Sequence, residues 1–345
     1  MEGNNLGQEP QIPIVPEQVP IQSSVVEKEV VLAPNKKGSS LPLILMFIAT
    51  IIIAVGCFFA YKEFAKKPEE AEVIKEEKIM FTESEYPRID GSTATQPLAD
   101  AYLKNFTGNK DATGVYNKTH QAYVNLINKE VDLILVTEPS AEELQLAKDK
   151  GMELEVIPVV NEAFVFYVNH NNKVNNLTLD QIRDIYAGKI KNWNEVGGDN
   201  VAIRAFQRPV NSGSQTGMLS MVMKDTKLMA APKEDIIETM EAIIGLVSSY
   251  DNDSNAIGYS YYYYATTMYD TIDKEVTNKI KFIGVDGVQP STATIKNGTY
   301  PLRSNYYIVI DKATPENSNT RKLVKAMLSE RGQQIAEAVG YVGIK

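Results

Sequence analysis

The sequence predicts an α/β protein joined to one membrane-spanning segment. From about residue 86 onward, β-branched apolar runs such as VDLILV (131–136) alternate with stretches of helical periodicity such as PLADAYLKNF (97–106). This alternation is typical of α/β folds. Between Lys37 and Lys62 the chain has 24 residues without a charge. The full length of 345 residues is sufficient for two domains.

The uncharged run divides the chain into four predicted parts. Residues 1–40 are rich in Pro, Gln, Glu and Val without lasting periodicity, which predicts a disordered tail. Residues 41–61 form an anchor, because at about 1.5 Å per residue a helix of this length crosses a bilayer core of about 30 Å. Residues 62–85 are a charged stalk, and residues 86–345 form the folded body.

The anchor has two alternatives and an open orientation. A cleaved signal peptide is disfavoured, since the run begins about forty residues into the chain. The sequence Ala-Val-Gly-Cys57 is an imperfect lipoprotein processing site, because Ala54 stands where Leu is usual. Two lysines precede the run closely and three follow it, so the positive-inside rule leans slightly towards a cytoplasmic body. The function predicted below requires the opposite orientation.

Composition excludes several classes of function. The net charge of -9 argues against nucleic acid as a partner, because binding there depends on a basic face. A small anion held by neutral donors stays possible. Cys57 is the single cysteine, so an internal disulfide is excluded, and with His120 and His170 it makes no recognisable zinc site. We therefore predict neither a metal nor a cofactor.

The first elements of the body are justified by local signals. Pro97 lies in the first turn of the helix 97–106, where its missing N–H costs nothing. Ser140 and Glu143 form a capping box that starts a helix, and Gly151 ends it. In order, the expected elements are the helix 97–106, a helix from Thr119, the strand 131–136, a helix over 140–151, and strands over 153–160 and 162–169.

The second part of the body continues the alternation. Tyrosines within 261–264 are expected to alternate between the core and the surface or cleft of a strand, and we leave them out of the site. In order, the expected elements are a helix and turn over 178–193, a strand over 201–208, a helix after residue 217, strands over 256–269, 281–288 and 300–310, and a helix over 320–339.

Three hydroxyl-rich turns are candidates for an oxyanion site. QRPVNSGSQTG (207–217) places one arginine before small hydroxyl and glycine residues at a helix start, where free N–H groups favour an anion. DGSTATQP (90–97) is a second such turn, and NKTHQ (117–121) is a third. Structural capping explains any one of them. Because ligands in open α/β sheets bind beyond the carboxyl ends of strands, the three together predict an oxyanion site.

Glu138 follows the strand 131–136 directly, and we weigh two roles for it. An ionised carboxylate only accepts hydrogen bonds, so it can receive a proton from hydrogen phosphate and repel sulfate. The alternative is a solvated acid favoured by the dipole of the following helix.

These motifs carry a resemblance to a known family. DGSTATQPLADAYLKNF, VDLILVTEPSAEEL, LTLDQIRDIYAGKIKNWNEVGG, QRPVNSGSQTG and GTYPLRSNYYIVI resemble the phosphate-binding protein of the Pst-type phosphate ABC transporter over residues 86–345. The resemblance implies a type II periplasmic-binding-protein-like fold with two lobes that close over a dehydrated phosphate. The lobes would be about 86–168 with 268–345, and about 169–267.

The resemblance also implies a set of phosphate-binding residues. Arg208 would give a bidentate charge-assisted pair, and Thr95 and Gln96 would offer a hydroxyl and a backbone N–H. Glu138 stands where the family has Asp, and Ser214 stands in the place of its Thr. The full set is Thr93, Thr95, Gln96, Thr119, Glu138, Arg208, Ser212, Gly213 and Ser214.

The predicted function is a membrane-anchored, extracytoplasmic solute-binding protein for an oxyanion, foremost phosphate. It would deliver its ligand to an ABC transporter permease and catalyse no reaction. One alternative is a sensor or adhesion ectodomain that reuses the fold. Another is a serine hydrolase using Ser212 or Ser214, which lacks a G-x-S-x-G elbow and an evident acid partner for either histidine.

Overall fold

A computed structural model describes residues 81–249 and 255–344. All of them lie in one compact unit, Glu77–Lys345. The predicted tail (1–40), the anchor (41–61) and nearly all of the stalk (62–85) lie outside the described residues. Within the described part, no helix has the length and apolar character needed to cross a membrane.

The body is an α/β protein, as predicted, and is built on a mixed sheet. The main strand order is β1-β2-β8-β3-β6-β5. β1 is parallel to β2, β8 is antiparallel to both β2 and β3, and β6 is antiparallel to β3. The bounds are β1 Ile89–Gly91, β2 Leu133–Val136, β3 Leu154–Asn169, β4 Asn176–Leu177, β5 Arg204–Ala205, β6 Ala256–Tyr261, β7 Ile280–Val285, β8 Arg303–Asp311 and β9 Val342–Gly343.

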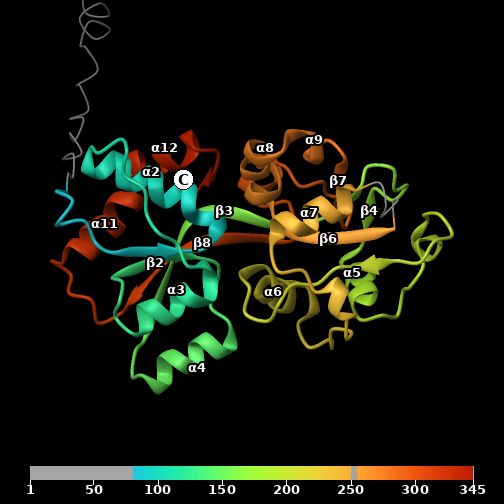
Figure 1. Cartoon of the computed structure of the whole chain (residues 1–345), viewed down its shortest axis with the longest axis horizontal. Helices are drawn as coiled ribbons and strands as arrows, with labels where there is room; N and C mark the ends of the chain where they lie inside the picture. The colour runs from blue at the N-terminus through green and yellow to red at the C-terminus, as the bar shows by residue number, and fades with distance from the viewer. Residues whose placement is uncertain (1–80, 250–254, 345) are drawn as a thin grey trace, which may run out of the picture. The chain divides into compact units, whose positions relative to one another are not determined.

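The long strand β3 divides the strands into two halves. Its residues Leu154–Ala163 pair with β8, whereas Phe164–Asn169 pair with β6 and β7. We call the elements around Leu154–Ala163 the first half and those around Phe164–Asn169 the second half (Figure 1). β7 pairs with Phe166–Asn169 and so belongs to the second half.

Helices surround the sheet in both halves, and several begin where the sequence predicts. Ser140 and Glu143 form the expected capping box, and Gly151 has the left-handed backbone of a helix stop, with φ +69°. In the first half lie α2 Gln96–Thr107, α3 Lys118–Ile127, α4 Ala141–Asp149, α11 Asn319–Leu328 and α12 Glu330–Ala338 (Figure 1). In the second half lie α5 Leu179–Tyr186, α6 Gly213–Gly217, α7 Met240–Ser248, α8 Tyr269–Ile272 and α9 Lys274–Thr277. α10 is Thr292–Lys296.

Several predicted elements are shorter than expected; the strand predicted over 201–208, for example, is only Arg204–Ala205. In two of them the hydrogen bonds give the reason. The strand predicted over 256–269 ends at Tyr261, because the N–H of Tyr263 donates to the Glu162 carboxylate (3.2 Å) rather than to a neighbouring strand. A π-helix, Tyr264–Met268, follows. The helix predicted over 320–339 is interrupted at Ser329, whose hydroxyl accepts from the N–H of Gly332 (3.1 Å) and starts α12.

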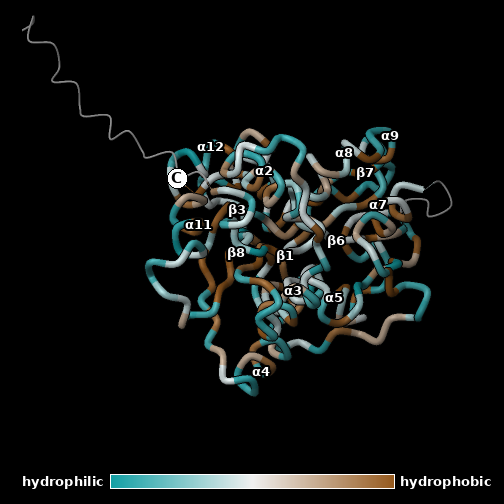
Figure 2. Tube along the Cα trace, turned by 60° about the vertical axis from the view of Figure 1, so that its left-hand side comes forward, coloured by the Kyte–Doolittle hydropathy of each residue, from teal (hydrophilic) through white to brown (hydrophobic). Residues whose placement is uncertain are grey.

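The interior beneath the two halves is apolar and rich in aromatic side chains. Hydrophobic stretches run along the strands, while hydrophilic ones follow the outer loops and helices (Figure 2). Phe164, Phe166, Tyr259 and Tyr261 are all buried and contact one another edge-on or tilted, with ring centroids 5.3 to 6.2 Å apart. This cluster forms a rigid support for the loops that follow β5 and β6.

Candidate functional site

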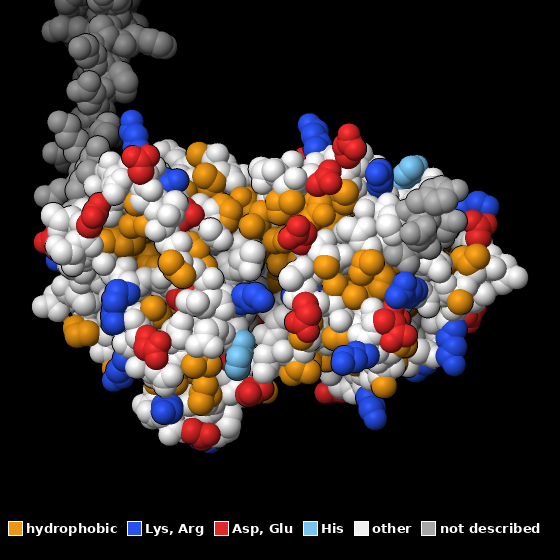
Figure 3. Space-filling model, in the orientation of Figure 1, with side chains coloured by type: hydrophobic (Ala, Val, Ile, Leu, Met, Phe, Trp, Pro, Cys, Tyr) orange, Lys and Arg blue, Asp and Glu red, His pale blue; other side chains and the backbone are white. Residues whose placement is uncertain are grey.

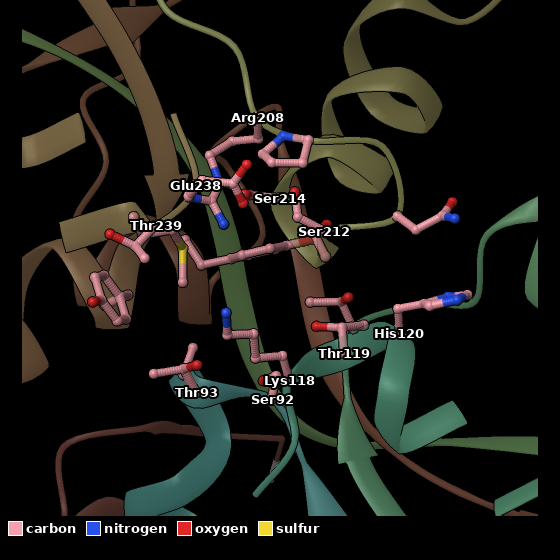
Figure 4. A pocket seen from close by; sticks show the side chains of 18 of the residues that line it. Ser92, Thr93, Lys118, Thr119, His120, Arg208, Ser212, Ser214, Glu238 and Thr239 are labelled. Carbon is pink, nitrogen blue, oxygen red and sulfur yellow. Dashed lines mark hydrogen bonds between the residues drawn. The ribbon is translucent and has the colours of Figure 1, made fainter. Parts of the chain in front are cut away.

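A cavity of about 450 Å³ lies where the three hydroxyl-rich turns meet (Figure 4). Both halves contribute to its walls, so its shape depends on their relative position. The first half supplies residues 92–94, residues 118–120 and Thr137. The second half supplies residues 208–214, residues 238–241, Tyr261 and Tyr264.

Arg208 is the buried cation of this cavity. Its side chain is only 9% exposed. Nε donates to Ser214 Oγ (3.3 Å) and Nη1 donates to the carbonyl of Ile237 (2.9 Å). Among the described residues, no carboxylate lies within ion-pair distance of the guanidinium. Burial lowers the pKa of Arg208, yet arginine keeps its charge in proteins. A buried charge without a counter-ion is costly, so this arginine is prepared for an anion.

The backbone around Arg208 is held by side chains of the second half. The N–H of Arg208 is shared between Tyr259 Oη (3.0 Å) and Gln215 Oε1 (3.1 Å). Tyr259 Oη in turn donates to Gln215 Oε1. Gln215 lies in α6, so these bonds join β6, the arginine loop and the start of α6. The direction of the guanidinium is therefore set by the fold rather than by a flexible loop.

The predicted residues at the start of α6 all line the cavity. Ser212 caps the helix, its hydroxyl accepting from the N–H of Gln215 (3.3 Å), while Ser214 Oγ accepts from Arg208. A Cβ on Gly213 would lie 2.6 Å from Thr137 Oγ1 and 2.8 Å from Thr119 Oγ1. Glycine is thus required for the close approach of this turn to the two threonines of the first half.

Replacing Gly213 by alanine is expected to weaken ligand binding about tenfold or more, because the added methyl group would hold the halves apart. The unfolding temperature should stay close to that of the parent, since opening of the cavity relieves the overlap. Calorimetric titration and thermal denaturation measure the two quantities. An alanine variant that binds the ligand as tightly as the parent protein would show that the halves do not need this approach.

The first half contributes three threonine hydroxyls from three different turns. Thr93 begins a 3-10 helix ahead of α2, and Thr119 lies in the first turn of α3. Thr137 follows β2 and is 2% exposed. Its Oγ1 is buried without a hydrogen-bond partner of normal geometry among the described residues. The hydroxyl of Tyr261, also at the cavity, donates to the carbonyl of Gly213 instead (3.3 Å). Thr137 therefore lines the cavity with a buried hydroxyl whose hydrogen-bonding capacity is not used at normal geometry by the described residues.

Three of the predicted site residues lie outside the cavity lining. Thr95 is fully buried, and its hydroxyl donates to the carbonyl of Leu135 (2.5 Å), which ties the turn to β2. Gln96 is the first residue of α2. Glu138 accepts a hydrogen bond from the hydroxyl of Ser220, in the π-helix Met218–Met223 that follows α6. Glu138 therefore makes a contact between the two halves.

A second contact of this kind lies nearby. Asn211 Nδ2 donates to Glu142 Oε2 (2.5 Å), and Asn211 has a left-handed backbone with φ 66°. Glu142 belongs to α4 in the first half and Asn211 to the arginine loop of the second half. The segment from Glu138 to Glu142 thus joins the halves along one side of the cavity.

The prediction from sequence missed several lining residues. Thr137 is the residue directly after the strand 131–136, and its position at the strand end was the available signal. Lys118 lies in the predicted third turn with a left-handed backbone, φ 67°. Tyr261 and Tyr264 also line the cavity, although the sequence analysis considered the tyrosines of 261–264 as cleft lining and left them out of the site. The other missed residues, which gave no local signal in the sequence, are Glu238, Thr239, Met240 and Glu241.

One expectation about the histidines is corrected. His120 does have an acid partner, because its Nδ1 lies 3.1 Å from Oε1 of the buried Glu143. However, within the described residues no hydrogen bond joins His120 to Ser212 or Ser214. Figure 4 shows the His120 side chain extending away from Ser212. The pair therefore does not form a nucleophile and base arrangement.

Comparison with known families places the chain. The family model described as PBP superfamily domain matches residues 82–331. The chain belongs to the PBP superfamily. This membership confirms the periplasmic-binding-protein-like α/β fold that the sequence resemblance implied.

Curated relatives and solved structures agree with this placement. The phosphate-binding protein PstS of Bacillus subtilis is 28% identical over 277 residues, which cover 77% of this chain and 81% of that protein. Protein SphX of Synechococcus elongatus is 26% identical over 275 residues, covering 73% and 76%. A Clostridium perfringens protein solved with bound phosphate matches with a TM-score of 0.56 at 24% identity, over 74% of this chain and 98% of that one. An ABC-type phosphate transport receptor from Vibrio cholerae matches with a TM-score of 0.56 at 21% identity, with the same coverage.

Proposed function

We propose that this protein captures phosphate in the cavity between its two halves and delivers it to the permease of an ABC transporter. The observation that carries the proposal is the buried guanidinium of Arg208, which has no carboxylate partner among the described residues and opens into a cavity lined by hydroxyl groups. A tetrahedral oxyanion supplies both the missing counter-charge and acceptors for those hydroxyls.

The relatives support this choice of ligand. Phosphate-binding protein PstS is the name of the Bacillus subtilis relative, and the Clostridium perfringens neighbour was solved with phosphate bound. We propose that Arg208, Ser214, Thr119 and Thr137 contact the anion, with Thr93, Ser212 and Gly213 completing the turns around it.

Binding would use charge and hydrogen bonds without any chemical step. Thr119 and Thr137 offer hydroxyls that both donate and accept, so they suit any protonation state of phosphate. Closure of the two halves about β3 would remove water from the anion and strengthen each of these bonds. Catalysis by Ser212 or Ser214 is not part of the proposal, because His120 is paired with Glu143 and contacts neither serine.

The N-terminal segments give the proposal its location. We propose that the uncharged run 41–61 anchors the protein and that the binding body lies outside the cytoplasm. This orientation follows from delivery of an external solute to a permease. The proposed orientation is opposite to the one that the slight excess of lysines after residues 41–61 favours. A protease-accessibility assay on intact cells tests this orientation. Digestion of the body in intact cells supports the proposal, whereas protection until lysis contradicts it.

The experiment that tests the function is calorimetric titration of the full chain with phosphate and with sulfate, repeated on Glu138→Gln. We expect the parent to bind phosphate. The Glu138→Gln variant should change the affinity for phosphate and the affinity for sulfate by no more than about twofold, because glutamine still accepts a hydrogen bond from Ser220. If Glu138→Gln instead gains sulfate binding, Glu138 reads the proton on phosphate, as one interpretation of the sequence holds. Failure of the parent to bind phosphate would contradict the proposed function.

A further inference from the structure

The cavity is larger than an inorganic anion requires. Its volume is about 450 Å³. A tetrahedral oxyanion occupies only a few times the volume of a water molecule, whose share of the liquid is about 30 Å³. Pockets for small organic ligands range from about 300 to 1,000 Å³. With phosphate against Arg208, Thr119 and Thr137, space is left along the wall formed by residues 238–241 and Tyr264.

That remaining wall carries negative charge. Glu238 and Glu241 both line the cavity and are exposed. Within the described residues, neither carboxylate takes part in an ion pair or a side-chain hydrogen bond. Met240 lies between them in sequence and also lines the cavity. Acids in this position repel an inorganic anion, so a site adapted to the bare anion alone gains nothing from them.

Tyr264 connects the acidic wall to the arginine. Burial raises the pKa of Tyr264 to about 12, with a further increase from the charge of Glu241 and an opposite effect from Arg208. The phenol is therefore within electrostatic range of both groups. Burial lowers the pKa of Arg208, and the negative charge of Glu238 opposes this shift. The positive and negative parts of the cavity are thus adjacent.

The charges that line the cavity balance. Lys118 and Arg208 are the cations, and Glu238 and Glu241 are the anions. Figure 4 shows the Lys118 side chain on the wall opposite Arg208 and Glu238, directed into the cavity. Figure 3 shows side chains of both charges where the two halves meet. A lining with equal numbers of both signs is complementary to a ligand that carries both signs.

We propose that the ligand of this cavity is a small phosphate monoester or phosphonate that carries an ammonium group. This inference rests on the proposed function, since it places the phosphate group on Arg208 and the threonine hydroxyls. The ammonium group lies beside Glu238 and Glu241, and its methylene groups pack against Met240 and Tyr264. An aromatic ring beside a cation adds to the attraction of the two carboxylates.

Three ligands of increasing complexity test the inference on the full chain by calorimetric titration. They are inorganic phosphate, propyl phosphate and 2-aminoethyl phosphate, the last two being of equal size and differing in the ammonium group. We expect 2-aminoethyl phosphate to bind at least tenfold more tightly than propyl phosphate and more tightly than inorganic phosphate. The double variant Glu238→Gln with Glu241→Gln should abolish the difference between the two esters.

A matched control separates this effect from a general loss of negative charge. Glu234 is an exposed acid of the preceding 3-10 helix, Lys233–Asp235, and lies outside the cavity lining. Glu234→Gln should keep the preference for 2-aminoethyl phosphate.

The outcomes distinguish the inference from the function on which it rests. Binding of inorganic phosphate with no preference between the two esters overturns the inference and leaves the proposed function standing. The same conclusion follows if the double variant keeps the full preference for 2-aminoethyl phosphate. Absence of binding by all three ligands overturns the proposed function itself.

Discussion

Replacing Arg208 by alanine is expected to weaken phosphate binding by about a hundredfold or more. Truncating one partner of a buried, hydrogen-bonded charge pair typically costs about 2 to 5 kcal/mol, and about 2.7 kcal/mol corresponds to a hundredfold change in affinity. The guanidinium is buried, and the other cation among the described lining residues, Lys118, lies on the opposite wall, so no cation beside Arg208 takes its place against the anion. Calorimetric titration with phosphate measures the effect.

The same substitution should leave the fold intact. The unliganded protein keeps a buried positive charge that no carboxylate of the described residues pairs with, so its removal should not lower the unfolding temperature by more than a few degrees. A matched control is Arg88→Ala, which removes an exposed arginine paired with Asp132 (2.8 Å); neither residue lines the cavity. This control should bind phosphate as the parent does. Unchanged phosphate affinity in Arg208→Ala would remove Arg208 from the site.

Replacing Glu162 by glutamine is expected to stabilise the protein at alkaline pH by up to about 3 kcal/mol. Glu162 is 2% exposed and lies in β3 next to the point where that strand passes between the halves. Burial raises its pKa from 4.5 to about 7, although backbone N–H groups of Ala163 (2.8 Å) and Tyr263 (3.2 Å) favour the charged form. Its surroundings are phenols whose own pKa values its charge raises: Tyr261, Tyr263, Tyr306 and Tyr341.

The sign of the pH dependence follows from this raised pKa. The folded state holds the proton more tightly than the unfolded state, so the contribution to stability is complete below about pH 4.5 and is lost as the pH rises towards 7. The difference between the two pKa values corresponds to about 3 kcal/mol. Glutamine is neutral at every pH and still accepts from the two N–H groups, so the variant escapes this loss.

Urea denaturation at pH 5 and pH 8 measures the prediction. The free energy of unfolding of Glu162→Gln should exceed that of the parent by about 3 kcal/mol at pH 8 and by less than about 1 kcal/mol at pH 5. The control is Glu234→Gln, which removes an exposed carboxylate. Its free energy of unfolding should equal that of the parent at both pH values. A glutamine variant that is less stable than the parent at pH 8 would show that the carboxylate is well solvated by its hydrogen bonds.

Much of the fold follows from local signals in the sequence. The capping box at Ser140 and Glu143, the proline in the first turn of α2 and the stop at Gly151 each act within a few residues. Helix caps and helix stops depend on interactions between residues that are close in the chain, so the sequence alone is enough to predict them. The break at Ser329 was missed because the apolar periodicity continues across it, although a serine that caps α12 was present in the sequence.

The candidate site was predictable as a set of turns, but not atom by atom. The sequence by itself determined the α/β class, the arginine with its Ser-Gly-Ser helix start, and the threonine turns, because residue type and spacing specify them. Only the tertiary structure decided that Thr137 faces the cavity while Glu138 contacts Ser220 in the other half. Successive side chains at a strand end point in different directions, so a difference of one residue changes the surface that a side chain reaches. The tertiary structure also places Glu238, Glu241 and Tyr264 in the lining of the same cavity. Their proximity depends on packing between segments that are distant in the chain.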